Sequence, residues 1–110
     1  MTDPGDILQT LETRTVHVSL RRDGIILQRM RPVQRQTMQD ARDNLAAFNT
    51  LAAGTPHPML LDARHPVTID AGVSNFYSSP ENTGSISAMA ILVGPRTGRS
   101  TTTLRSSEAR

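Results

Sequence analysis

The chain has 110 residues, which fits one domain and leaves too little apolar surface for two. It has no cysteine, which excludes disulfide-stabilised folds and thiolate metal sites, and its formal net charge of +2 does not predict nucleic-acid binding. Since no basic-then-apolar leader and no apolar run of membrane length occurs in it, we expect a cytoplasmic protein with no membrane partner.

Residues 14–21 alternate between apolar and polar side chains, which predicts a half-buried strand. Asp23-Gly24 follows as a turn, and the apolar run after it predicts the second strand of a hairpin, which ends near Pro32. A two-residue loop places Leu20 opposite Leu27, with the register open by one residue. The stretch before the hairpin, 1–13, is expected to be an N-terminal extension.

An apolar stripe at alternating spacings of three and four residues predicts a helix over 37–53. Thr37 with Asp40 resembles a capping box, and Gly54 with the prolines after it predicts the end of the helix. The stripe consists of Met38, Ala41, Leu45, Phe48 and Ala52.

Two continuous apolar runs, 59–61 and 86–93, predict strands that are buried on both faces. Between them, Thr68 is expected to cap a shorter helix with Ile69, Val73 and Phe76 turned inward. Right-handed crossovers make the second, third and fourth strands parallel. The predicted fold class is therefore α/β: an N-terminal β-hairpin followed by α-β-α-β, with a mixed sheet of about four strands and helices on one face.

Residues 14–95 are expected to form the domain, and 96–110, rich in Arg, Ser and Thr, a polar tail. Helices on one face leave the other face of the sheet uncovered. That face stays exposed unless the tail, the N-terminus or a second copy of the chain covers it, so we expect a homodimer or another homo-oligomer, and a protein partner is a further expectation.

The layout resembles bacterial STAS domains of the anti-sigma-factor-antagonist, or SpoIIAA-like, type. The resemblance rests on the hairpin 16–30, the helix 37–53, and the segment Met59-Leu-Leu-Asp-Ala-Arg-His-Pro-Val-Thr-Ile-Asp-Ala-Gly72, which leads into 86–94. It implies a small regulatory domain that binds other proteins.

Members of that family commonly carry Asp-Ser-Ser-Gly or Asp-Thr-Ser-Gly at the start of the helix after the third strand, and a kinase phosphorylates the second hydroxyl residue. The matching stretch here is Ile69-Asp70-Ala71-Gly72, which lacks the acceptor. The tail also lacks an apolar pattern for the family's final helix, strand and helix. The resemblance therefore implies a domain without the usual phosphoacceptor serine, which is either a shortened member or one whose missing layer comes from a partner.

Ligands of parallel sheets bind beyond the carboxyl ends of the strands, where the loop after 59–61 gathers polar residues. His65 near carboxylates has the chemistry of a general base, and a triad of Ser74 or Ser78 with His65 and Asp70 can be drawn, although no nucleophile elbow surrounds either serine. An exposed loop with a capping aspartate explains the same residues without any ligand. We take five of them as partner-binding candidates: Asp62, Arg64, His65, Asp70 and Ser74.

No metal or other cofactor is expected, because His57 and His65 stand at opposite ends of an extended segment and no glycine-rich phosphate cradle occurs. The predicted function is a non-enzymatic regulatory or protein-interaction domain. The alternatives are a small-ligand or lipid-binding module, since related domains resemble Sec14-type carriers, and an enzyme that uses His65. The arginines of the hairpin region lack interleaved aromatics and fit a solvated strand edge better than a nucleic-acid platform; they are Arg21, Arg22, Arg29, Arg31 and Arg35.

Overall fold

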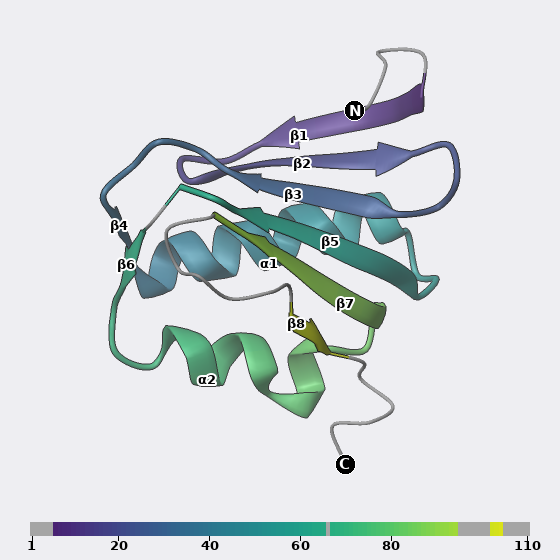
Figure 1. Cartoon of the computed structure of the whole chain (residues 1–110). Helices are drawn as coiled ribbons and strands as arrows, with labels where there is room; N and C mark the ends of the chain where they lie inside the picture. The colour runs from purple at the N-terminus through teal and green to yellow at the C-terminus, as the bar shows by residue number, and fades with distance from the viewer. Residues whose placement is uncertain (1–5, 66, 95–101, 105–110) are drawn as a thin grey trace.

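The main structural unit is a six-stranded mixed sheet, whose strands follow one another across the sheet in chain order (Figure 1). The computed structural model describes residues 6–65, 67–94 and the strand 102–104. The six strands are β1 (Ile7–Glu12), β2 (Val16–Arg21), β3 (Ile26–Met30), β5 (His57–Ala63), β7 (Ile86–Val93) and β8 (Thr102–Leu104).

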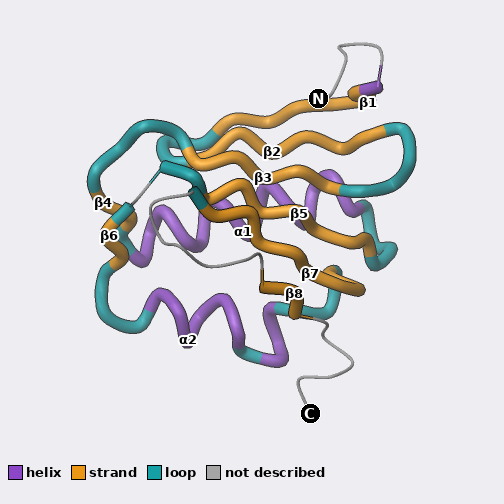
Figure 2. The backbone as a smooth tube through the Cα atoms, viewed as in Figure 1, coloured by secondary structure: helices purple, strands orange, loops and turns teal. Residues whose placement is uncertain are grey.

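Helices and a short two-stranded ribbon connect the central strands. Helix α1 (Met38–Ala52) lies between β3 and β5 in the sequence, and α2 (Val73–Ser78) lies between β5 and β7. Figure 2 shows α1 crossing one face of the sheet, and α2 packs beside it. A 3-10 turn, η2 (Pro80–Asn82), follows α2, and the ribbon consists of the parallel strands β4 (Arg35–Gln36) and β6 (Thr68–Ile69).

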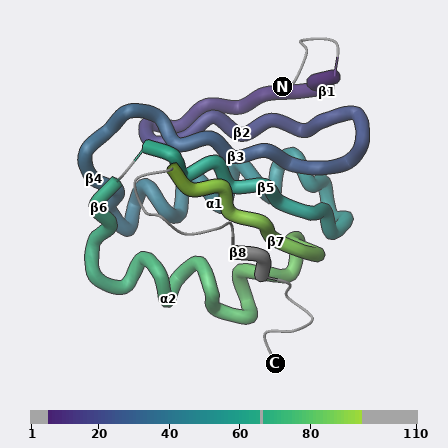
Figure 3. Tube along the Cα trace, viewed as in Figure 1, coloured from purple at the N-terminus to yellow at the C-terminus, as the bar shows by residue number. Residues whose placement is uncertain are grey.

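The predicted α/β class and the strand directions are confirmed. β2 and β3 are antiparallel, whereas β3, β5 and β7 are parallel to one another. The sheet is wider than the expected four strands because two more segments join it, as the colours of Figure 3 show for the N-terminal one. Residues 7–12, expected in the N-terminal extension, pair with β2, and 102–104, expected in the tail, pair with β7. Residues 1–5 and the rest of the tail lie outside the described residues.

The hairpin turn is one residue longer than predicted. The N–H of Arg21 donates to the carbonyl of Ile25, and that of Gly24 donates to the carbonyl of Arg21, so three residues form the loop. Gly24 has φ +91°, the left-handed conformation that such loops place at their last residue. Leu20 consequently lies opposite Ile26 instead of Leu27, and every pair between β2 and β3 shifts by one residue.

Helix α1 begins and ends as predicted. The Thr37 hydroxyl accepts from the Asp40 N–H and the Asp40 carboxylate accepts from the Thr37 N–H, which completes the capping box. The buried face differs from the predicted stripe, because it includes Asn44 and Leu51, while Leu45 is half-buried. A polar residue thus occupies the middle of the helix face that packs on the sheet.

The second helix is shorter than predicted. Thr68 and Ile69 form β6 instead of the first helical turn, and the helix begins after Gly72, whose φ of +86° is left-handed. Ile69 is consequently 43% exposed, and the prediction that it turns inward is wrong. Val73 is fully buried, as predicted.

The core lies between α1 and one face of the sheet. Phe48 and Leu51 of α1 pack among side chains that alternate along the strands, such as Val16, Val18 and Met59. Successive strand residues point to opposite faces, so the residues between these core positions lie on the face away from α1. We call that second surface the open face.

Candidate functional site

Two of the predicted site residues, Asp62 and Arg64, form an ion pair at the carboxyl end of β5. The Asp62 carboxylate accepts from Nε of Arg64 at 2.9 Å and from its Nη2 at 2.7 Å. Asp62 is only 7% exposed, although it alternates with core residues and so lies on the open face. Donation by Arg64 holds the pKa of Asp62 below its usual value, against burial, which raises it.

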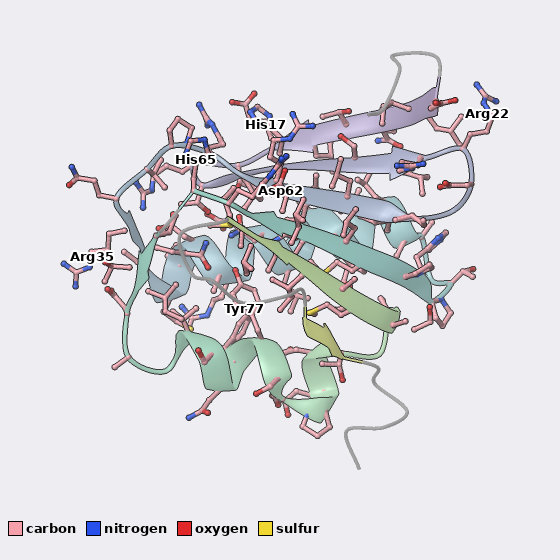
Figure 4. All side chains as sticks on the ribbon, in the orientation of Figure 1. His17, Arg22, Arg35, Asp62, His65 and Tyr77 are labelled. Carbon is pink, nitrogen blue, oxygen red and sulfur yellow. The ribbon has the colours of Figure 1, made fainter. Side chains whose placement is uncertain are left out.

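A row of charged side chains continues from Asp62 across the sheet. The strand register places Asp62 opposite Arg29, Arg29 opposite His17, and His17 opposite Glu12. Figure 4 shows His17 and Asp62 on neighbouring parts of this region. Two further arginines bind the carboxylates of the row, so the charged row consists of Glu12, His17, Arg29, Arg31, Asp62 and Arg64.

The two carboxylates of the charged row are paired differently. Within the described residues Glu12 is paired with one arginine, and its Oε2 lies 2.9 Å from Nη1 of Arg31. Asp62 has two, because Nε of Arg29 lies 4.0 Å from its Oδ2 in addition to the Arg64 contacts. The side chains of both arginines, Arg29 and Arg64, are more than half exposed, at 56% and 58%. The Asp62 end of the row therefore has an excess of positive charge that faces solvent.

Apolar side chains lie on the open face beside the Asp62 end of the charged row. Leu92 of β7 lies opposite Asp62, and Leu60 lies opposite Ala90. All three of these apolar residues are half-buried, and we call them the apolar patch. In the part of the chain that the structure describes, both helices pack away from this face (Figure 1).

Asp70, another predicted site residue, is held elsewhere by a different arginine. Its Oδ1 accepts from Nε of Arg35 at 2.5 Å, and its N–H donates to the Gln36 carbonyl at 3.0 Å. This pair borders a shallow depression of about 490 Å³ on the β4–β6 ribbon. The depression is lined by Gln34, Arg35, Thr68, Ile69, Asp70 and Ala71.

The five predicted site residues therefore do not form one site. His65 and Ser74 are exposed, and the Ser74 carbonyl accepts from Oγ of Ser78 at 3.0 Å. Within the described ranges, no hydrogen bond or ion pair joins Asp62 and Arg64 to Asp70.

A buried polar network occupies the same end of the molecule, on the helix side of the sheet. Asn44 is fully buried; its Nδ2 donates to Oγ1 of Thr15 at 2.9 Å and to the Tyr77 hydroxyl at 3.1 Å. The Tyr77 hydroxyl donates to Oε1 of Gln36 at 2.7 Å. Burial raises the pKa of Tyr77 to about 12, opposed by the hydrogen bond from Asn44. The network joins α1, α2, β4 and the turn before β2.

Asp40 and Arg14 extend this network to the start of α1. The Asp40 carboxylate accepts from Nε of Arg14 at 2.9 Å and from the N–H of Thr37 at 2.8 Å. Nη2 of Arg14 also donates to the Arg35 carbonyl at 2.7 Å. The bond from Arg14 holds the pKa of Asp40 far below its usual value, although burial acts in the opposite direction.

Within residues 6–65 and 67–94, no group of three His, Asp or Glu side chains is arranged to hold a metal ion. None of the helices in the same ranges combines the length and the apolar character needed to cross a bilayer. Comparison of the chain with models of protein families, with curated proteins and with solved structures gave no match. The charged row and the apolar patch are therefore interpreted from their own geometry.

Sequence reasoning found Asp62 and Arg64 as site candidates, named Arg29 and Arg31 only as part of a solvated strand edge, and missed Glu12 and His17. Glu12, His17 and Arg29 stand on three different strands, so only the register brings them together. The predicted hairpin register places His17 opposite Met30, whereas the three-residue loop places it opposite Arg29. The outward alternation of His17 was a usable signal, but the loop length that completes the row was not evident from Asp23-Gly24 alone.

Proposed function

We propose that this protein is a non-enzymatic regulatory domain that binds a protein partner through the open face of its sheet. The observation that carries the proposal is the apolar patch, Leu60, Ala90 and Leu92, which is half-buried and lies beside the charged row, on the face opposite α1. Contiguous apolar surface rimmed by polar groups is typical of protein interaction sites.

The chemistry of the charged row supports recognition more than catalysis. Both carboxylates of the row are bound by arginines. The hydrogen bond from Arg64 lowers the pKa of Asp62, so the Asp62 carboxyl group is ionised near neutral pH and is a poor proton donor. Exposed guanidinium groups beside apolar side chains are common in interface centres, because arginine both packs and donates several hydrogen bonds.

The proposal keeps the anti-sigma-factor-antagonist type of domain as the model for this protein, with one difference. The matching stretch is one residue shorter than that of the family and has Ala71 as its single residue between Asp70 and Gly72, so the acceptor is absent, and Asp70 is bound by Arg35. We therefore propose that binding is not switched by phosphorylation at this stretch. The depression on the β4–β6 ribbon, with the exposed Ile69, is a second contact region for the same partner.

A protein partner fits the open face better than a second copy does. Two copies that meet through this face would each bring the same excess of positive charge from Arg29 and Arg64. The homodimer expected from the sequence is therefore an alternative outcome of the experiment below. The small-ligand or lipid-binding alternative receives less support, because the described depression lies on the surface of the ribbon and is bordered by an ion pair.

Site-specific photo-crosslinking tests the proposal. A photoreactive phenylalanine analogue replaces Leu60 in the full chain, expressed in the source cell, and Asn49, exposed on α1, is the matched control position. We expect a discrete adduct with another protein from position 60 and none from position 49. Equal adducts from both positions, or none from position 60, would contradict the proposal. An adduct of twice the chain mass would identify a second copy as the occupant.

A further inference from the structure

The Asp62 end of the charged row has unused hydrogen-bond donors. Arg64 binds Asp62 through Nε and Nη2, so its Nη1 group has no partner among the described residues. Arg29 makes one ion contact within the same residues, at 4.0 Å, which is too long for a hydrogen bond. Both side chains are more than half exposed, so their free N–H groups are accessible from solvent.

Asp62 holds the Arg64 donors in place. Its carboxylate is nearly buried on the open face, binds the Arg64 side chain in a two-bond fork and accepts the Arg64 N–H at 3.3 Å. A carboxylate fixed in this way orients the arginine beside it, because the planar guanidinium and carboxylate groups match each other in two bonds. The remaining face of the arginine is therefore presented to solvent in a defined orientation.

The charge of this end matches a singly charged anion. Arg29 and Arg64 contribute two positive charges and Asp62 one negative charge, which leaves an excess of one positive charge. The other carboxylate of the row, Glu12, is already paired with Arg31. A carboxylate balances this single positive charge. A dianionic phosphate would leave one unbalanced negative charge beside the Asp62 carboxylate.

The apolar patch defines the neighbourhood of that anion. Leu92 lies opposite Asp62 on the next strand, and Leu60 precedes Asp62 by two residues on the same face. A ligand that places a carboxylate on the two arginines thus has an apolar side chain within reach of both leucines. A peptide segment with an acidic residue next to a leucine, isoleucine or valine has this combination.

We infer that Arg64, oriented by Asp62, and the neighbouring Arg29 form a binding site for an aspartate or glutamate side chain of the partner protein, with an adjacent apolar side chain of that partner on Leu60 and Leu92. This inference rests on the proposed function and adds to it the chemistry of the partner segment. Bidentate contacts between guanidinium and carboxylate groups supply the specificity, and the apolar contact supplies buried area.

Peptide titration followed by NMR of the ¹⁵N-labelled full chain tests this site. The probes are a capped peptide that alternates leucine and glutamate and the same peptide with glutamine in place of glutamate. We expect the glutamate peptide to bind about tenfold more tightly, as a charge-assisted hydrogen bond provides, and to shift the Nε–H signals of Arg29 and Arg64. We also expect this preference to fall as salt rises.

Two variants with the same charge change supply the control. Arg29→Gln removes one of the two proposed donors, whereas Arg42→Gln removes an exposed arginine of α1. The glutamate preference should disappear in Arg29→Gln and persist in Arg42→Gln. Equal loss in both variants, or equal binding of the two peptides by the wild type, would overturn the site.

A third peptide distinguishes the two oxyanion chemistries. Phosphoserine replaces glutamate, and we expect binding no tighter than that of the glutamate peptide; much tighter binding would overturn the carboxylate assignment. Failure of this inference is distinguishable from failure of the proposed function. If the crosslink from position 60 forms while the two leucine peptides bind equally, the open face binds a partner of other chemistry and only this inference is wrong.

Discussion

Two arginine–aspartate pairs at the same end of the molecule have nearly equal exposure but different structural consequences. The side chains of Arg14 and Asp40 are 56% and 7% exposed, and those of Arg64 and Asp62 are 58% and 9% exposed. The first pair joins the turn before β2 to the start of α1, and Arg14 also reaches β4. The second pair joins residues two positions apart on one segment, with a second arginine nearby.

The comparison shows that burial of a carboxylate does not by itself distinguish a structural pair from a recognition pair. What distinguishes them is the set of elements that the pair connects and the number of donors left over. On the helix side of the sheet, the hydrogen bonds of Asp40, Asn44 and Tyr77 join segments that are distant in the chain. On the open face, the hydrogen bonds between Asp62 and Arg64 join two residues of the same segment. Stability and binding should therefore respond to substitution on opposite sides of the sheet.

The largest effect on stability is expected at Asn44. In Asn44→Ala, Thr15 and Tyr77 lose a buried partner and a small cavity forms, so we expect a loss of about 3 kcal/mol in the free energy of unfolding. Urea denaturation measures this quantity, with Asn49→Ala on the exposed side of the same helix as the control. Because alanine has a higher helix propensity than asparagine, Asn49→Ala should cause no loss, and equal changes in the two variants would show that the network adds nothing to stability.

The next largest effect is expected at Asp40, where the free energy of unfolding should depend on pH. Because Arg14 depresses the pKa of Asp40 in the folded state, the stability that this group contributes is present above its unfolded pKa and is lost as pH falls below about 4. Asp40→Asn should cost about 2 kcal/mol at neutral pH and should flatten the fall in stability in acid. Urea midpoints measured between neutral and acidic pH check this, and parallel pH profiles for the wild type and the variant would contradict it.

A smaller effect is expected at Tyr77. Tyr77→Phe removes the hydroxyl that bridges Asn44 and Gln36, which should cost about 1 kcal/mol. Since the folded-state pKa is raised to about 12, tyrosinate absorbance should develop well above the usual pH of about 10, and stability should fall as pH rises between these values. Ionisation of native Tyr77 at its ordinary pH would show that the hydroxyl is hydrated.

The smallest effect on stability is expected on the open face. Arg29→Gln removes an exposed side chain with a 4.0 Å ion contact, so the free energy of unfolding should change by less than about 0.5 kcal/mol. Thermal and urea unfolding measure it beside the peptide titrations. A loss comparable to that of Asn44→Ala would place Arg29 with the structural groups and remove the contrast between the two faces.

Much of the fold followed from the sequence, because its signals are local. Alternation defined β2, the Thr37 and Asp40 cap defined the start of α1, and apolar runs defined β5 and β7. The parallel directions followed from the handedness of crossovers. β1 was missed as a strand because its alternation is interrupted at the bulge between Ile7 and Gln9.

The candidate site was less accessible from sequence because it depends on pairing between strands. Asp62 and Arg64 are neighbours in the chain and were found, but Arg29 joins them only through the register of β3 on β5. Asn44 stood outside the predicted apolar stripe as a polar residue, and its burial is explained by hydroxyl groups from Thr15 and Tyr77, which are distant in the chain. Long-range partners of this kind leave no periodic signal.

The parallel centre of the sheet also has a kinetic consequence. β1, β2 and β3 pair with their neighbours in the chain, whereas β3 meets β5 only after α1 has been traversed, as the pairing of Ile26 with Met59 shows. Closing that long loop costs chain entropy before any contact compensates for it. Folding should therefore start with the pairing of β1, β2 and β3, and the docking of β5 should limit its rate. During synthesis on the ribosome, the first three strands therefore emerge with the apolar face that α1 later covers still exposed to solvent, until α1 and β5 have been synthesised.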